Sequence, residues 1–158
     1  MVFECYGRQI KVCETVLKTI QSYCQCDHES CEAGGVLLGR ENISNDNLII
    51  EYATEPLPKD RRYRSRFYRT DKGHINFYHK LYKESSGIYV YVGEWHTHPE
   101  AVPNYSLIDL YGWEKIRRDA DNEVGQIHLI AGYDALRAWY LSIENKKPKL
   151  LTTFFWKR

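Results

Sequence analysis

Long hydrophobic runs are absent from this 158-residue chain. No apolar stretch approaches the roughly 20 residues that a helix needs to cross a bilayer, so the sequence predicts no transmembrane helix. The opening residues, MVFECYGRQIK, also lack a basic segment followed by an apolar one. We therefore expect no signal peptide and a cytoplasmic location.

An excess of charge of one sign is missing as well: 22 lysines and arginines nearly balance 21 acidic residues, for a net charge of +1. Without a strong overall field, we expect neither a nucleic acid nor a membrane surface as the partner. The charge is unevenly spread, because residues 59–72 (KDRRYRSRFYRTDK) hold seven lysines and arginines against two aspartates. The segment predicts a loop that is either simply solvated or a clamp for an extended substrate tail, with Arg64 and Arg66 pairing with its carboxylates or carbonyls.

Cysteines are few and odd in number, five in all. In a chain for which no export signal is expected, this favours reduced thiols over a disulfide framework. Cys24, Cys26, His28 and Cys31 form a rival metal-binding pattern, but spacers of one residue suit a single tetrahedral ion poorly. Cys24 also continues the apolar stripe of a predicted helix, where a free cysteine behaves as a small hydrophobic residue. A second metal in this cluster stays an open alternative.

Composition and periodicity predict one α/β (α+β) domain over residues 1–158. Hydrophobic residues make up 43% and charged residues 27%, which is typical of a globular protein, and the length suits a single core. Apolar residues at spacings of three and four predict a helix over 11–25, and β-branched runs predict strands. The expected order is helix 11–25, strands 33–39 and 48–52, helix 74–83, strand 88–92, helix 106–118 and strands 126–131, 136–143 and 150–156, with turns at 132–134 and 145–148.

Two histidines and an aspartate form the most informative pattern. His96 and His98 follow the strongest strand signal, and because side chains alternate along a strand, both imidazoles point to one side. Asp109 lies eleven residues after His98, in the first turn of a helix that a proline-bearing loop can fold back toward the histidines. Two imidazoles and a carboxylate leave the fourth tetrahedral position to water, as in catalytic zinc sites. The pattern predicts one Zn²⁺ per chain and a bound water whose pKa falls to roughly 7.

The remaining catalytic roles have more than one candidate. Ser106 stands three residues before Asp109, so its hydroxyl either caps the helix or donates a hydrogen bond to an oxyanion. Hydrolysis also needs a carboxylate that carries protons and is not a metal ligand. The residue pattern alone leaves Glu32, Glu94 and Glu100 open for that role.

The motifs together resemble those of a known family. HTH (96–98), seven intervening residues and SLID (106–109) resemble the H-[ST]-H-x7-S-x2-D signature of the JAMM (MPN-plus) metalloproteases, whose zinc sites remove ubiquitin and ubiquitin-like proteins. EAGGVLLG (32–39) is similar to the strand that carries the family's catalytic glutamate. The resemblance implies an MPN fold, a mixed sheet flanked by helices as in cytidine deaminase. It assigns Glu32 as general base and acid, Ser106 as oxyanion donor, and His96, His98 and Asp109 as zinc ligands.

A narrower resemblance suggests a substrate. The string GEWHTHPE (93–100) and the basic element at 64–66 resemble bacterial JAMM proteins encoded beside activating and conjugating (E1/E2-like) enzymes in CBASS antiphage operons. This implies an isopeptidase that cuts after the C-terminal tail of a conjugated nucleotidyltransferase that makes cyclic oligonucleotides. Two other functions stay open: a peptidase that processes a sulfur-carrier or ubiquitin-like tail with the same site, and a non-catalytic MPN binding scaffold.

Overall fold

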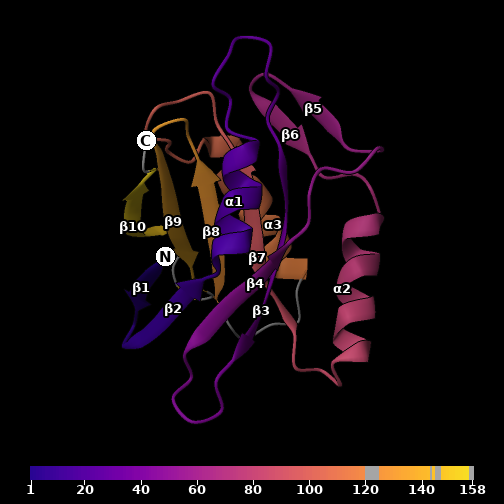
Figure 1. Ribbon diagram of the computed structural model, residues 1–158, viewed down its shortest axis with the longest axis vertical. Helices are drawn as coiled ribbons and strands as arrows, with labels where there is room; N and C mark the ends of the chain where they lie inside the picture. The colour runs from indigo at the N-terminus through magenta and orange to yellow at the C-terminus, as the bar shows by residue number, and fades with distance from the viewer. Residues whose placement is uncertain (120–124, 143, 145–146, 157–158) are drawn as a thin grey trace.

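The computed structural model describes residues 1–119, 125–142, 144 and 147–156 (Figure 1). In the described part of the chain, no helix is both long and apolar enough to cross a membrane. The elements are, in order, β1 (Val2–Cys5), β2 (Arg8–Val12), α1 (Glu14–Ser22), β3 (Gly34–Glu41), β4 (Leu48–Ala53), β5 (Arg61–Tyr63), β6 (Arg66–Tyr68), α2 (Gly73–Glu84), β7 (Val90–Thr97), α3 (Leu107–Asp119), β8 (Gln126–Ala131), β9 (Ala135–Leu141) and β10 (Lys149–Phe155).

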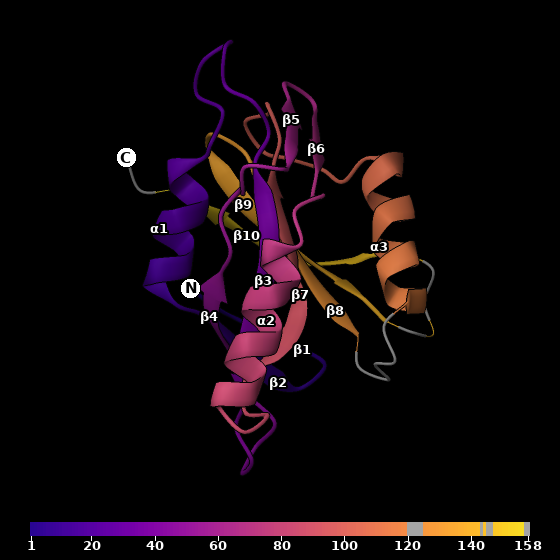
Figure 2. The same cartoon turned by 90° about the vertical axis from the view of Figure 1, so that its right-hand side faces the viewer.

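One mixed sheet organises the molecule, with its strands in the order β1-β2-β4-β3-β7-β8-β9-β10. The pairs β2/β4 and β7/β8 are parallel, and the other neighbours are antiparallel. Helix α1 covers one face and α3 the other, as Figure 2 shows. The separate β5–β6 hairpin stands at one end of the sheet, beside the segment that joins α1 to β3 (Figure 1, Figure 2). Strand β7 is therefore paired on both edges and covered on both faces.

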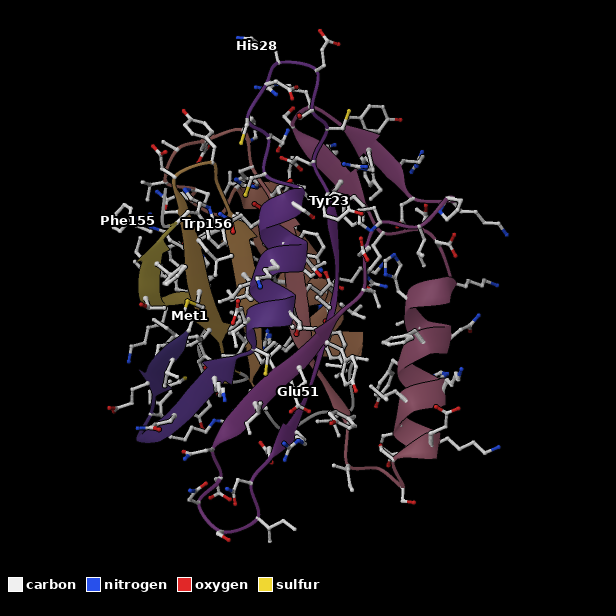
Figure 3. All side chains as sticks on the ribbon, viewed as in Figure 1. Met1, Tyr23, His28, Glu51, Phe155 and Trp156 are labelled. Carbon is white, nitrogen blue, oxygen red and sulfur yellow. The ribbon has the colours of Figure 1, made fainter. Side chains whose placement is uncertain are left out.

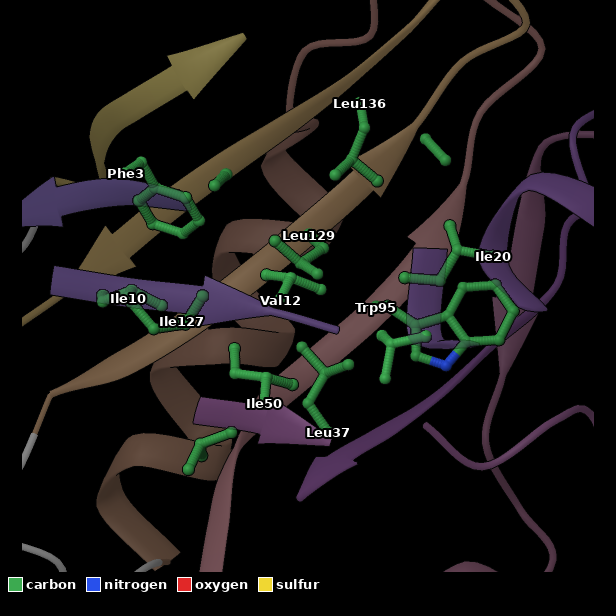
Figure 4. Close-up of a cluster of buried hydrophobic side chains, with 14 of the residues drawn as sticks. Phe3, Ile10, Val12, Ile20, Leu37, Ile50, Trp95, Ile127, Leu129 and Leu136 are labelled. Atoms are coloured by element: carbon green, nitrogen blue, oxygen red, sulfur yellow. The ribbon is translucent and has the colours of Figure 1, made fainter. Parts of the chain in front are cut away.

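Two hydrophobic clusters fix the helices on the sheet. The larger one lies between the sheet and α1, where Ile20 of α1 and Trp95 of β7 are buried together (Figure 4). The smaller one lies on the opposite face, where Trp113 of α3 packs with Ile130 and neighbouring aromatic residues. The Trp113 ring also stacks on the ring of His128, with their centroids 4.2 Å apart. These contacts hold α3 above β8, close to the end of β7.

The structure confirms the predicted mixed sheet and most of its elements, but the predicted helix 11–25 is too long. Residues Arg8–Val12 form β2 instead, because alternating Ile10 and Val12 face the core while their neighbours face solvent. The β1–β2 hairpin turns at Tyr6 and Gly7, both with positive φ, which is the geometry of a two-residue hairpin loop. Helix α1 begins only at Glu14, after this hairpin.

The basic segment differs from the predicted loop. Its residues 61–68 form the β5–β6 hairpin, in which Arg61 pairs with Tyr68 and Tyr63 with Arg66. Three-residue strands are too short to show a period in the sequence. The last predicted turn, at 145–148, and the end of the predicted strand 136–143 lie partly outside the described residues; β9 ends at Leu141.

Candidate metal centre and catalytic site

A β-bulge in β7 sets the direction of the histidines. On β3, Leu37 pairs with Gly93 and Leu38 with Tyr91, so Val92 is an extra residue on β7. Gly93 has a φ of 153°, and a Cβ there would lie 1.7 Å from the carbonyl oxygen of Ile127, so only glycine fits. After the bulge, Trp95 points into the α1-side core while the His96 ring lies 6.3 Å from Trp113 of α3.

Neighbouring strands hold the end of β7 on both sides. His96 pairs with Gly34 of β3 and with Ile130 of β8. The backbone N–H of His98 donates to the carbonyl of Ala131 at 2.9 Å, and the N–H of Thr97 donates to the carbonyl of Ala33 at 2.9 Å. The Thr97 hydroxyl oxygen accepts a further bond from the N–H of Ala33 at 3.0 Å. These hydrogen bonds fix the backbone of the His-Thr-His segment between β3 and β8.

A reciprocal cap brings the aspartate to the histidines. The backbone N–H of Ser106 donates to Asp109 Oδ2 at 2.6 Å, and the N–H of Asp109 donates to Ser106 Oγ at 3.2 Å. This is the capping-box arrangement at the start of α3, with aspartate in the place of the usual glutamate. In the cap the Ser106 hydroxyl acts as an acceptor, which leaves its hydrogen free to donate elsewhere.

His96, His98 and Asp109 could hold a metal, because one ligand atom from each lies within 4.8 Å of the other two. The two Nε2 atoms are 3.0 Å apart; His96 Nε2 is 3.3 Å from Asp109 Oδ1, and His98 Nε2 is 3.3 Å from Asp109 Oδ2. Two ligand atoms on a tetrahedral zinc ion, each about 2.0 Å from the metal, are themselves about 3.3 Å apart. The donor set and its spacing therefore fit one zinc ion.

Burial and mutual hydrogen bonding shift the pKa values of these candidate ligands. Burial alone would raise the pKa of Asp109, but hydrogen bonds to His96 and His98 outweigh it and hold this pKa well below its usual range. Burial likewise favours neutral His98, but the hydrogen bond to Asp109 outweighs it and raises the pKa of the imidazole. Asp109 therefore stays an anion, the form that binds a cation.

Glu32 lies next to the histidines without joining the ligand cluster. Its Oε1 is 3.9 Å from His98 Nε2, and the residue is only 5% exposed. Burial raises its pKa to about 7, although the nearby histidines and the backbone N–H of Phe67 lower it. A carboxyl group with this pKa can both accept and donate a proton near neutral pH.

The other two candidate glutamates are engaged differently. Glu94 forms an ion pair with Arg69, with Nε–Oε1 at 2.9 Å and Nη2–Oε1 at 2.5 Å. Glu100 accepts a hydrogen bond from the backbone N–H of Asn104 at 3.0 Å. Glu32 is thus the carboxyl group whose surroundings best fit a proton carrier.

A cleft of about 810 Å³ passes over this cluster. Its floor is the end of β7; one wall consists of residues 65–70 from the hairpin and the segment after it, and the other is α3. Figure 2 shows the hairpin and α3 on either side of the end of β7. Ile108 and Tyr111 present exposed apolar surface on the α3 wall. The cleft is open to solvent, and His96 and His98 are among the residues that line it.

The two arginines predicted to bind substrate lie in different places. Arg66 lines the cleft and donates to the Tyr68 hydroxyl at 2.8 Å. Arg64 turns away and donates through Nη1 to the backbone carbonyls of Asp27 and Ser30. Its guanidinium thus bridges two carbonyls of the loop that follows α1. No local sequence signal indicates this long-range contact.

The Cys24–Cys31 pattern is spread along this loop. Cys24 Sγ contacts the carbonyl of Gly132 at 3.2 Å, and burial raises the pKa of its thiol to about 12. Cys26 is exposed, and His28 lies at the outer end of the loop (Figure 3). Across the described residues, the one group of three or more metal-binding side chains in reach of each other is His96, His98 and Asp109.

The fold and this site together define a JAB/MPN-type domain. A family profile described as "Prokaryotic homologs of the JAB domain" matches residues 15–142, and the chain belongs to that family. A protein of Pseudomonas aeruginosa named "CD-NTase/cGAS isopeptidase" is 34% identical over 123 residues, 78% of this chain and 77% of that protein. A protein of the same name from Vibrio cholerae is 32% identical over 139 residues, 88% of this chain and 83% of its own length.

Solved structures agree with this fold. The solution structure of a protein from Desulfitobacterium hafniense matches with a TM-score of 0.60, covering 89% of this chain and 88% of that one. A protein from Salinibacter ruber matches with a TM-score of 0.51, covering 90% and 88%. At 16% and 18% identity, these likenesses concern the fold alone.

Proposed function

We propose that the chain is a zinc-dependent isopeptidase that cuts after the C-terminus of a conjugated CD-NTase, a nucleotidyltransferase that makes cyclic oligonucleotides. The observation that carries the proposal is the convergence of His96, His98 and Asp109, with Glu32 3.9 Å from His98 at the floor of an open cleft. The names of the relatives from P. aeruginosa and V. cholerae support the choice of substrate. The cut would reverse a conjugation made by E1/E2-like enzymes.

His96, His98 and Asp109 would hold one zinc ion per chain. When bound, zinc supplies a Lewis acid and lowers the pKa of a coordinated water toward neutrality. Asp109 contributes an anionic ligand, and its cap with Ser106 fixes the direction of the carboxylate. The paired edges of β7 fix the two imidazoles in the same way.

Glu32 would carry the proton through the reaction. Its carboxylate takes a proton from the attacking water while the water oxygen bonds to the carbonyl carbon that joins the tail to an amine. When the carbon–nitrogen bond breaks, Glu32 returns this proton to the leaving amine. Ser106 donates its free hydroxyl hydrogen to the carbonyl oxygen as negative charge develops there. The products are a tail with a free carboxylate and the released amine.

The substrate tail would lie in the cleft between the hairpin and α3. Arg66 is placed to meet a carboxylate or a carbonyl of the tail, while Ile108 and Tyr111 offer apolar contact on the other wall. Arg64 would act indirectly, by keeping the loop after α1 closed.

The test uses purified wild type and Glu32→Gln, with zinc counted in both by mass spectrometry. Each is incubated with a CD-NTase C-terminal tail joined to a reporter protein, once by a peptide bond and once through a lysine. We expect one zinc per chain in both, and cleavage after the last tail residue by wild type alone, stopped by a chelator. If a reporter with a sulfur-carrier tail is cleaved and the CD-NTase reporter is not, the sulfur-carrier protein is the substrate instead. Absence of both zinc and cleavage would replace it with a binding scaffold.

A further inference from the structure

We propose that the β5–β6 hairpin holds the catalytic glutamate in its working position and that Arg62 is the positioning residue for it. This inference rests on the proposed function, because it assigns a role to a residue that acts through Glu32. Arg62 is exposed and lies outside the cleft lining, so neither burial nor the expected substrate path explains what its side chain does.

The backbone of Glu32 is fastened to the hairpin at both of its polar groups. Its N–H donates to the carbonyl of Tyr63 at 2.8 Å. Its carbonyl accepts a hydrogen bond from Arg62 Nε at 2.9 Å, and Arg62 Nη2 donates to the preceding carbonyl, of Cys31, at 3.0 Å. A planar guanidinium can span two successive carbonyls in this way, whereas a lysine ammonium is a single point charge.

A second set of contacts orients the guanidinium. Arg62 Cζ lies 5.5 Å from the ring centroid of Tyr23, the C-cap residue of α1. The Tyr23 hydroxyl donates to Glu55 at 2.8 Å, and its ring lies 5.9 Å from that of Trp95. Figure 3 shows Tyr23 at the end of α1 nearest the hairpin. Arg62 is therefore built into the joint between α1, the Glu32 segment and the hairpin.

The same hairpin forms one wall of the cleft, from Ser65 onward. Glu32 lies just before β3, and the next residue, Ala33, is hydrogen-bonded to Thr97 of β7. Arg62 and Tyr63 thus decide where the carboxyl group stands relative to the metal ligands. A displacement of about 1 Å in a catalytic group can reduce turnover by about 100-fold.

Kinetics of single-residue variants test the role. Arg62→Met is expected to lower kcat about 100-fold with KM changed little, because a misplaced base slows the chemical step without removing a substrate contact. Arg62→Lys is expected to recover only part of this loss. Arg61→Met is the matched control: Arg61 stands on the same strand and carries the same charge, but its guanidinium lies over Tyr68, 4.7 Å from the ring centroid. We expect the control to keep the wild-type kcat.

Hydrogen exchange of the Glu32 amide tests the same role without any substrate. In Arg62→Met the exchange rate of this amide is expected to rise at least tenfold over wild type, while in Arg61→Met it stays unchanged. Zinc content is expected to be equal in all three proteins. Wild-type exchange and wild-type kcat in Arg62→Met would overturn the inference. If wild type cleaves no tail at all, the proposed function fails, while the exchange data still decide whether Arg62 positions Glu32.

Discussion

Substitutions at Ser106 can separate its two roles, the helix cap and the oxyanion donor. The cap bond from the N–H of Asp109 to Ser106 Oγ is 3.2 Å long, and its loss in Ser106→Ala costs about 1 kcal/mol. The reciprocal bond from the Ser106 N–H to Asp109 Oδ2 uses the backbone and survives the change. In a chain of 158 residues this corresponds to a fall in Tm of about 2–4 °C.

Glycine at the same position changes only one of the two roles. An N-cap glycine costs just a few tenths of a kcal/mol relative to serine, so Ser106→Gly is expected to keep a Tm close to that of wild type. It still lacks the hydroxyl, and removing one oxyanion donor lowers kcat by about 100- to 1000-fold. Ser106→Thr keeps both the cap and the hydroxyl and serves as the matched control.

The assay combines thermal unfolding, zinc counting and steady-state cleavage of the tail reporter for these three variants. We expect zinc to stay at one per chain throughout, with kcat strongly reduced in the alanine and glycine variants and largely kept in the threonine variant. A glycine variant with wild-type kcat would show that Ser106 is a cap and nothing more.

Three further predictions concern the ligands, a buried histidine and the thiols. Asp109→Asn removes the anionic ligand and is expected to lose zinc on dialysis while the far-ultraviolet circular dichroism stays that of wild type; retained zinc would argue against this ligand. Burial lowers the pKa of His128 to about 3. The unfolded chain, with a histidine pKa of about 6.5, takes up the proton first, so His128 lowers stability as pH falls from about 6.5 toward 3. With a chelator present, the free energy of unfolding, measured with urea, is expected to fall less steeply with decreasing pH in His128→Leu than in wild type. Equal slopes in the two proteins would refute this. Cys24, with its pKa raised to about 12, is expected to react with iodoacetamide far more slowly than exposed Cys26, as peptide mass spectrometry can measure.

The elements that the sequence predicts best are those with local signals. The HTH and SLID motifs combine fixed spacing with a strand and a helix cap, and in the structure these same residues come together at the end of β7. Apolar runs likewise indicate β3 and β8, whose consecutive residues are mostly buried in the sheet. The β1–β2 hairpin was missed because Tyr6, with a φ of 49°, is an unusual residue for its turn, which leaves Gly7 as the only local sign.

Contacts between distant segments explain what the sequence could not indicate. Arg62 and Arg64 look alike within one basic run, yet each donates to backbone carbonyls 30 or more residues away. Carbonyl groups belong to every residue, so no side-chain pattern marks such partners. The sequence of the basic segment therefore predicts a solvated loop or a clamp. In the structure, Arg62 and Arg64 instead hydrogen-bond to the backbone of the segment between α1 and β3.

The bulge at Val92 and Gly93 determines which face of the sheet each later side chain of β7 occupies. A regular strand through the same residues, starting from the pairing of Tyr91 with Leu38, would shift each later residue by one position against β3. His96 would then turn toward α1, and Trp95 would turn toward the cleft. The side of the sheet on which the candidate metal-binding histidines lie thus depends on one extra residue upstream in β7. A sequence with the same histidines but without this extra residue would present them on the opposite face of the sheet.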